Sequence, residues 1–211
     1  MKKIAFHTLG CKLNFSETEY IQESCLKSNY ILVKSNLISD IYVINTCSVT
    51  ENADKECKYL IRKFKKQNPL SKIIIIGCYA QLKPNEIIKI KNVDLVLSTK
   101  EKFQITKYLD ELFNENDSRV YSCNINEVKN FQTSYSINNR TRSFLKVQDG
   151  CDYKCTYCTI PMARGLSRSD TVKNILNQIN KISKSDVKEI VLTGINLGDF
   201  GKSNPNNRVR Q

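Results

Sequence analysis

Several features are scarce or absent in the 211-residue sequence, and each absence narrows the possible functions. The longest purely apolar run is the four isoleucines at 73–76, far short of the roughly 20 residues that a membrane span needs. No apolar stretch follows the basic N-terminal residues before Cys11, so no export signal is visible. The single histidine, His7, has no second histidine or carboxylate motif beside it, and we interpret it as structural. We therefore expect a cytoplasmic protein without membrane contact.

Cysteine, by contrast, is abundant, with nine residues. Without an export signal, these are better interpreted as free thiols, metal ligands or buried side chains than as a disulfide framework, and their odd number agrees. Cys25 and Cys57 fall on the apolar faces of predicted helices, which is typical of core residues. Cys123 ends a predicted strand next to a linker, and no role is assigned to it.

The net charge of +12 is unevenly distributed, since residues 101–127 are mildly acidic while the segments on both sides are basic. A basic balance of this size favours a polyanionic partner such as RNA. A lysine-rich surface without a specific partner is the alternative. The same two interpretations apply to the basic outer face of the predicted helix at 58–66.

The first part of the chain alternates short apolar runs with amphipathic stretches. This pattern predicts a Rossmann-like α/β domain with a mostly parallel sheet over residues 1–123. A capping-box pattern, Ser16 with Glu19, predicts a helix from Ser16 to about Lys27. Ala53, Cys57, Leu60, Ile61 and Phe64 form an apolar stripe on a second helix. Strands are predicted at 3–9, 41–46, 72–77, 94–98 and 119–123, and further helices at 51–67, from about 84 and at 101–115.

Residues 124–141 lack a clear period and predict a linker. A strand at 143–150, a helix at 170–182 and a strand at 189–194 follow, which is the β-α-β beginning of a second domain over residues 142–211. The helix presents its apolar residues on one face: Val172, Ile175, Leu176, Ile179 and Ile182.

Three cysteines each lie directly after a predicted strand: Cys11, Cys47 and Cys78. The carboxyl ends of strands in an open parallel sheet face one common edge, where ligands bind, so these cysteines can converge despite their separation in sequence. A lone strand-end cysteine is commonly a small buried hydrophobe. Three of them together favour a metal or cluster site.

Three further cysteines are closely spaced in "GCDYKCTYC", where Cys151, Cys155 and Cys158 form a C-x3-C-x2-C pattern. Structural zinc sites usually close a four-ligand shell with two C-x2-C pairs, and the sequence has no second pair. A [4Fe–4S] cube normally takes four thiolates, so three leave one iron open for another ligand. An iron–sulfur cluster is therefore favoured, and a zinc-binding RNA protein remains the alternative.

This pattern, in a loop that follows the first strand of a domain, resembles the signature of the radical S-adenosylmethionine enzymes. Five motifs narrow the resemblance to the methylthiotransferases: "GCKLN", "NTCSVTENADK", "GCYAQ", "KVQDGCDYKCTYCTIPMARG" and "LTGINLGDFG". They occur in the family's order over residues 3–201. "NADK" and "QDGCDYKCTYC" are most similar to enzymes that modify N6-threonylcarbamoyladenosine at position 37 of tRNA. Relatives acting on isopentenyladenosine or on a ribosomal protein share the cysteines and remain alternatives.

The resemblance implies two [4Fe–4S] clusters, an auxiliary one at Cys11, Cys47 and Cys78 and a radical-generating one at Cys151, Cys155 and Cys158. One S-adenosylmethionine would methylate sulfur at the auxiliary cluster. A second would be cleaved to the radical that abstracts hydrogen from C2 of the adenine. Electrons would come from a flavodoxin or ferredoxin, and the tRNA would bind through its anticodon loop.

The family contacts S-adenosylmethionine at the end of the second barrel strand, which corresponds here to Thr193, Gly194 and Asn196. An ordinary turn position is the alternative for Gly194. Arg164 and Arg168 are candidates for binding a phosphate or carboxylate, with a solvated loop position as the alternative. Gly150 is expected to relieve crowding beside the second cluster.

The sequence departs from the family in its length, since it holds only the first β/α units of the partial TIM-type radical barrel. We therefore expect a C-terminally incomplete enzyme with an open barrel edge at 189–194, poor solubility and reduced activity. A non-catalytic iron–sulfur module is the alternative function.

Overall fold

The structure, a computed structural model, describes residues 1–47, 51–114, 117–137 and 141–202, without the side chains of residues 51–53 and 114. The described residues exclude part of the predicted linker and the end of the chain from residue 203. The predicted place of the Ala53 side chain on the apolar stripe of its helix also lies outside them. No helix within the described ranges has the length and apolar character that crossing a membrane requires.

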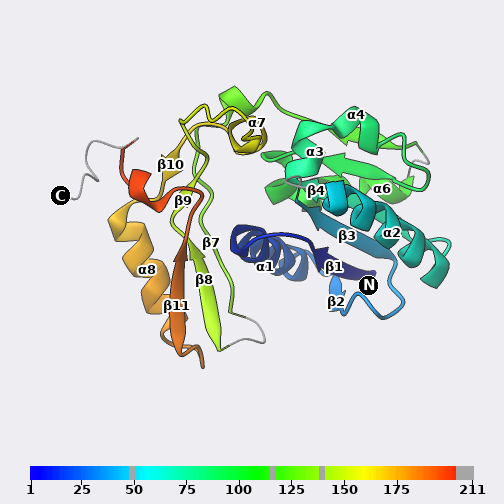
Figure 1. Ribbon diagram of the computed structural model, residues 1–211. Coiled ribbons are helices and arrows are strands. Elements are labelled where there is room, and N and C mark those ends of the chain that lie inside the picture. Colours follow the sequence, from blue (N-terminus) through cyan, green and yellow to red (C-terminus); the bar gives the residue numbers. More distant parts are fainter. Residues whose placement is uncertain (48–50, 115–116, 138–140, 203–211) are drawn as a thin grey trace.

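The first half of the chain forms a six-stranded, all-parallel sheet with the strand order β2-β1-β3-β4-β5-β6 (Figure 1). The predicted α/β fold is confirmed. The prediction missed β2, because this edge strand has only three residues and its apolar run, Ile31 to Val33, is too short to distinguish it from a loop. The strands are β1 (Lys3–Thr8), β2 (Ile31–Val33), β3 (Ile41–Thr46), β4 (Lys72–Gly77), β5 (Leu95–Leu97) and β6 (Arg119–Tyr121).

Helices cover both faces of this sheet, as its continuous apolar strands require. On one face, the predicted stripe of α2 (Glu51–Gln67) is buried at Cys57, Leu60, Ile61 and Phe64, and α3 (Cys78–Leu82) and α4 (Pro84–Ile87) pack beside it. The other face packs against α1 (Lys12–Lys27), α5 (Ile105–Leu109) and α6 (Glu111–Asn114). A short 3₁₀ helix, η1 (Glu101–Gln104), precedes α5, so the helix predicted at 101–115 is broken into three pieces.

Helix α1 begins at Lys12, with Cys11 as its N-cap, so the start predicted at Ser16 is wrong. The Ser16 hydroxyl donates to the Leu13 carbonyl at 2.9 Å and lies 3.1 Å from the Ser134 hydroxyl instead of capping a helix. Leu13, in the first turn of the helix, is buried. Its tertiary packing outweighs the capping-box pattern at Ser16, so the helix begins closer to β1 than predicted.

The second half contains a three-stranded sheet with the order β11-β8-β7. Strand β8 (Arg142–Lys146) pairs in parallel with β11 (Glu189–Thr193) across α8 (Val172–Ile182), which confirms the predicted β-α-β beginning and leaves β11 at the sheet edge. The strand predicted at 143–150 is split, since β9 (Gln148–Asp149) turns away to pair with β10 (Arg168–Ser169). Of the predicted apolar face of α8, Ile175 and Ile182 are buried, whereas Val172 and Leu176 are exposed.

Helix α1 lies between the two sheets and contacts β7 (Ser134–Tyr135) and β8 as well as β1 (Figure 1). The predicted linker therefore carries structure, because β7 and η2 (Ile125–Glu127) fall within it. Its backbone is attached to α1, since the Ile137 amide donates to Glu19 at 2.7 Å. The elements α7 (Ile160–Arg164) and η3 (Leu197–Asp199) complete the described fold.

Candidate functional site

The strand-end cysteines follow three neighbouring strands of the parallel sheet. Cys11 lies three residues after β1, Cys47 directly after β3, and Cys78 directly after β4 as the first residue of α3. These strands are adjacent in the order β1-β3-β4, with their carboxyl ends at one edge. The three thiols therefore come from adjacent loops at the edge where open α/β sheets bind ligands.

Glycine 10 allows Cys47 to approach the Cys11 loop. Gly10 has a φ of +108°, and a Cβ built on it would lie 2.7 Å from the Cys47 Cβ and 3.2 Å from its Sγ. A side chain there would collide with the cysteine, so the loop needs glycine for both its backbone angle and its closeness to Cys47.

The residue types at this edge fit a thiolate-bound cluster, although the side chains do not form a closed site for a single ion. Within the described ranges, no three histidine, cysteine, aspartate or glutamate side chains are grouped closely enough to hold one metal ion. A four-iron cube is wider than one ion, so its thiolates attach at more widely separated points. Exposure falls from Cys11 through Cys47 to the buried Cys78, as it would for ligands at a partly covered edge.

The close-spaced cysteines lie in the loop between β9 and α7. Cys155 and Cys158 are exposed and Cys151 is half-buried, and a turn joins the Cys158 amide to the Cys155 carbonyl at 3.0 Å. Tyr157, between them, is 98% exposed. The loop thus presents two exposed thiols and one half-buried thiol outside the hydrophobic cores.

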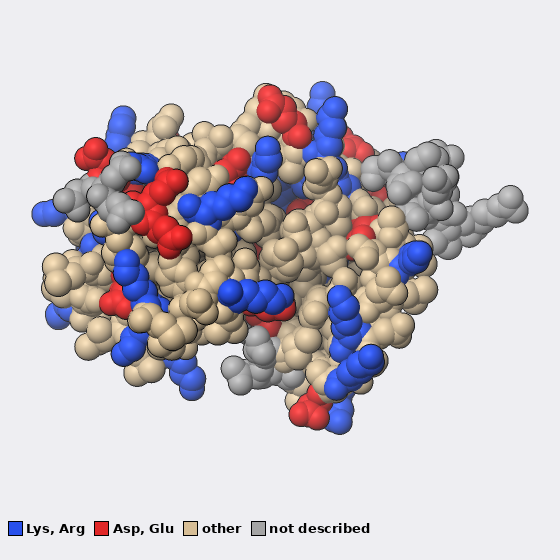
Figure 2. Space-filling view, turned by 180° about the vertical axis from the view of Figure 1, so that it is seen from behind, with Lys and Arg blue, Asp and Glu red and all other residues tan. Residues whose placement is uncertain are grey.

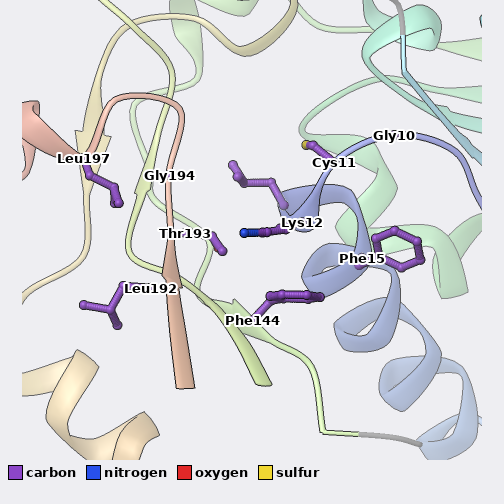
Figure 3. A pocket seen from close by; sticks show the side chains of 10 residues that line it. Gly10, Cys11, Lys12, Phe15, Phe144, Leu192, Thr193, Gly194 and Leu197 are labelled. Atoms are coloured by element: carbon purple, nitrogen blue, oxygen red, sulfur yellow. The ribbon is translucent and has the colours of Figure 1, made fainter. Parts of the chain in front are cut away.

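A cavity of about 620 Å³ separates the start of α1 from the ends of β8 and β11. Figure 3 shows Lys12 extending from α1 toward Thr193 on β11, with Phe144 of β8 below them. The lining residues are Gly10, Cys11, Lys12, Leu13, Phe15, Phe144, Leu192, Thr193, Gly194 and Leu197. Among the described residues that line the cavity, Lys12 is therefore the one with a charged side chain, and the rest are largely apolar.

The predicted contacts with S-adenosylmethionine divide between this cavity and its border. Thr193 and Gly194 line the cavity together with Cys11. Asn196 is not among the lining residues. Its backbone N–H donates to Gln148 Oε1 at 2.8 Å, and its side-chain Nδ2 donates to Asp199 Oδ2 at 3.1 Å. Sequence reasoning missed Lys12 and Phe144, although the position of Lys12 next to Cys11 was available as a signal.

Arg164 and Arg168 are buried, so the interpretation as solvated loop residues is wrong, whereas binding of a phosphate or carboxylate ligand stays a prediction. Arg164 is 2% exposed and Arg168 is 6% exposed. Arg164 pairs with Glu17 and Asp149, and Arg168 with Asp149. Burial by itself lowers the pKa of Arg164, but Glu17, Cys78, Asp149 and Cys11 outweigh it and raise the pKa well above the ordinary value. The guanidinium of Arg164 thus stays charged next to the N-terminal cysteines.

The remaining cysteines are not part of the site. Cys25 and Cys57 are fully buried in the two cores, as predicted, and burial raises the pKa of each thiol to about 12. The Cys123 sulfur accepts a hydrogen bond from Ser98 at 3.4 Å. His7 is half-buried in β1 with its ring edge against Phe64, and burial lowers its pKa.

The charged surface can be followed on one face of the molecule. On the face shown in Figure 2, lysine and arginine side chains are scattered among acidic and uncharged residues. Lys58, Arg62, Lys63 and Lys66 are exposed along the outer side of α2. RNA contact by this helix stays a prediction.

Gly150 gives a testable prediction about the second cysteine loop. A Cβ on Gly150, which has a φ of +73°, would lie 2.1 Å from the Leu166 carbonyl oxygen, so the crowding comes from the end of α7. We expect Gly150→Ala to lower the free energy of unfolding by about 3 kcal/mol or more, measured by denaturant titration. Gly198→Ala is the control, since its Cβ would meet nothing closer than 3.4 Å and should change stability by less than about 0.5 kcal/mol. Equal effects of the two substitutions would contradict this explanation.

Two family models match the chain. Residues 3–98 match the uncharacterized protein family UPF0004, and residues 145–198 match the radical SAM superfamily. The first match includes Cys11, Cys47 and Cys78 and the second includes Cys151, Cys155 and Cys158.

Curated relatives match nearly the whole chain. It is 38% identical to the threonylcarbamoyladenosine tRNA methylthiotransferase MtaB of Aquifex aeolicus, over 94% of this chain and 49% of that protein. It is 39% identical to MtaB of Bacillus subtilis, over 96% of this chain and 45% of that protein. A tRNA-2-methylthio-N(6)-dimethylallyladenosine synthase of Chloroherpeton thalassium is 29% identical over 98% of this chain and 46% of that protein. The chain thus spans about half the length of these relatives, and it belongs to the radical S-adenosylmethionine methylthiotransferase family.

Proposed function

We propose that the chain takes part in adding a methylthio group to C2 of N6-threonylcarbamoyladenosine at position 37 of tRNA. The observation that carries this proposal is the cavity that places Cys11, from the N-terminal set of cysteines, opposite Thr193 and Gly194 at the end of β11. A substrate base in this cavity would lie between a thiolate-held sulfur source and the strand end where a radical precursor binds. The names of the relatives support the substrate class.

In this proposal, residues 1–123 form the domain that holds an auxiliary [4Fe–4S] cluster through Cys11, Cys47 and Cys78. Residues 142–211 form the first part of the radical domain, joined through 124–141. The loop of Cys151, Cys155 and Cys158 holds the second cluster, which would supply electrons for cleaving S-adenosylmethionine. A flavodoxin or ferredoxin would be the donor and the anticodon loop of tRNA the partner.

The protein's own residues bind and orient the base in the cavity. Phe144 and Leu192 give it apolar walls, and Lys12 adds one cation, with its Nζ 5.8 Å from the centre of the Phe144 ring. Threonine attached to adenine through a carbamoyl group carries a free carboxylate, whereas an isopentenyl group is apolar. Lys12 therefore favours the threonylcarbamoyl substrate, because an ammonium group pairs with a carboxylate. The apolar walls alone would favour the isopentenyl alternative.

Binding of the two free nucleosides tests this assignment. We expect Lys12→Met to weaken binding of N6-threonylcarbamoyladenosine to the reconstituted chain by roughly tenfold, the effect of losing one charge-assisted hydrogen bond. Binding of N6-isopentenyladenosine should change less than twofold. Isothermal titration calorimetry measures both constants.

Lys184→Met is the matched control, because Lys184 is exposed and does not line the cavity. It should leave both constants unchanged. Stronger binding of N6-isopentenyladenosine than of N6-threonylcarbamoyladenosine by the unsubstituted chain would instead support the alternative substrate.

A further inference from the structure

Six charged side chains are buried together between the two halves of the chain. Among the described residues, ion pairs join four cations to two carboxylates: Lys102, Lys146, Arg164 and Arg168 with Glu17 and Asp149. Each of these side chains is at most 8% exposed. Buried charges are retained only where partners hold them in place, so this group fixes α1 and η1 against β8, β9, α7 and β10.

Arg164 makes the contact in this group that reaches the N-terminal cysteine loops. Its Nη1 donates to Glu17 Oε1 at 3.1 Å and to Asp149 Oδ1 at 3.0 Å. Its Nη2 donates to Asn14 Oδ1 at 2.6 Å. The planar guanidinium thus binds two carboxylates and an amide at once, which a lysine ammonium matches poorly.

Asn14 in turn joins two of the cysteine loops. Its Nδ2 donates to the Leu9 carbonyl at 2.9 Å and to the Thr46 carbonyl at 3.1 Å. Leu9 lies two residues before Cys11, and Thr46 immediately precedes Cys47. The Cys11 Sγ also lies 3.9 Å from Asn14 Oδ1, the oxygen that accepts from Arg164.

The backbone next to Arg164 holds the other cysteine loop. The carbonyl of Gly165 accepts from the Cys151 amide at 3.0 Å. The carbonyl of Ala163 accepts from the Thr99 hydroxyl at 2.9 Å, which fixes α7 to the N-terminal half. One short segment, Ala163 to Gly165, therefore contacts the Cys151 loop directly and reaches the loops of Cys11 and Cys47 through Asn14.

The charge of Arg164 suits a negatively charged group at the N-terminal cysteines. The buried ion pairs hold more cations than carboxylates, and a low-polarity interior does not favour such an excess unless an anion lies near. Asn14 Oδ1, which accepts from Arg164, lies 3.9 Å from the Cys11 Sγ, and α7 contacts α3, which begins at Cys78. Thiolates bound to a cluster supply negative charge at these positions.

We propose that Arg164 is a positioning residue, which holds the loops of Cys11 and Cys47 in place through Asn14 and lies beside Gly165, which binds the Cys151 loop. Its buried positive charge stabilises the reduced form of the group held by Cys11, Cys47 and Cys78. This inference rests on the proposed function, because it requires a cluster at the N-terminal cysteines. Arg164 acts through its charge and through Asn14 and is not a ligand.

The reduction potential of the N-terminal cluster tests the proposal. The full chain carrying Cys151→Ala, Cys155→Ala and Cys158→Ala serves as the parent, so that the N-terminal cluster is observed alone. We expect Arg164→Met to shift the equilibrium between oxidised and reduced cluster at least tenfold toward the oxidised form, a potential lower by about 59 mV or more. Arg164→Lys should restore most of the potential while leaving the thermal midpoint lowered, because it returns the charge without the three contacts. Redox titration followed by electron paramagnetic resonance measures the potential.

Lys102→Met is the matched control, since it removes one buried cation from the same Glu17 without touching Asn14. Its shift should be less than half that of Arg164→Met, and equal shifts or an unchanged potential in Arg164→Met would overturn the proposal. Should Arg164→Met not fold, Arg164→Gln removes the charge but keeps a side-chain amide that can donate to Asn14, and an unchanged potential there would overturn the proposal equally. A parent that binds no iron would contradict the proposed function rather than the role of Arg164.

Discussion

Replacing Cys151, Cys155 and Cys158 together by alanine is expected to lower the iron content of the anaerobically reconstituted chain from about eight atoms to about four, because a cube-type cluster holds four irons. Replacing Cys11, Cys47 and Cys78 should cause the same loss. Only the first substitution should also abolish reductive cleavage of S-adenosylmethionine, because in the proposed function the cluster of this loop would supply the electrons for that cleavage. Iron analysis and chromatography of 5′-deoxyadenosine measure the two quantities.

Cys123→Ala is the control for this experiment, since Cys123 is a half-buried thiol outside both sets. It should retain all the iron. A chain with about four irons that the first triple substitution leaves unchanged would hold only the N-terminal cluster, which supports the non-catalytic alternative. Zinc in place of iron would contradict both clusters and support the zinc-binding alternative.

The sheet and the strand-end cysteines could be predicted because their signals are local. Each central strand is a continuous apolar run, and a run of this kind flanked by helical patterns leaves few arrangements other than a parallel sheet. Once β1, β3 and β4 were neighbours, the loops of Cys11, Cys47 and Cys78 had to meet at one edge. The edge strand β2 escaped prediction because its apolar run covers only three residues, Ile31 to Val33, which is shorter than the runs of the central strands.

The buried ion pairs could not be predicted, because they depend on contacts between distant segments. Arg164 lies 147 residues from Glu17 and 150 from Asn14 in sequence. A short stretch with two arginines, serines and a glycine is typical of a solvated loop, and nothing local distinguishes it from a buried one. The role of Lys12 was hidden for a similar reason, since it depends on how α1 lies against β8 and β11.

Glu17→Ala is expected to give the largest loss of stability of any single substitution considered, about 3–5 kcal/mol. Glu17 is 1% exposed and accepts from Lys102 at 2.6 Å, Lys146 at 3.0 Å and Arg164 at 3.1 Å. Its removal takes away the carboxylate that pairs with Lys102 and leaves Lys146 and Arg164 to share Asp149 with Arg168. Glu23→Ala is the control on the same helix. Its carboxylate forms an exposed pair with Lys27, and the substitution should cost less than about 1 kcal/mol in urea unfolding.

The same ion pairs make the stability depend on pH. Burial by itself raises the pKa of Glu17, but Arg164, Lys102 and Lys146 outweigh it and hold the pKa well below its ordinary value of 4.5. For Asp149, Arg164 and Lys146 likewise outweigh burial and lower the pKa to about 2. Carboxylates with lowered pKa values stabilise the fold fully above their ordinary pKa and lose this contribution as the pH falls toward the pKa of the folded state.

We therefore expect the free energy of unfolding to decrease from about pH 5 downward, with Asp149 alone accounting for roughly 2 kcal/mol by pH 2. In Glu17→Gln, which cannot ionise at this position, the decrease should be smaller over the same range. An unchanged slope in Glu17→Gln would show that other carboxylates govern the acid sensitivity of the chain.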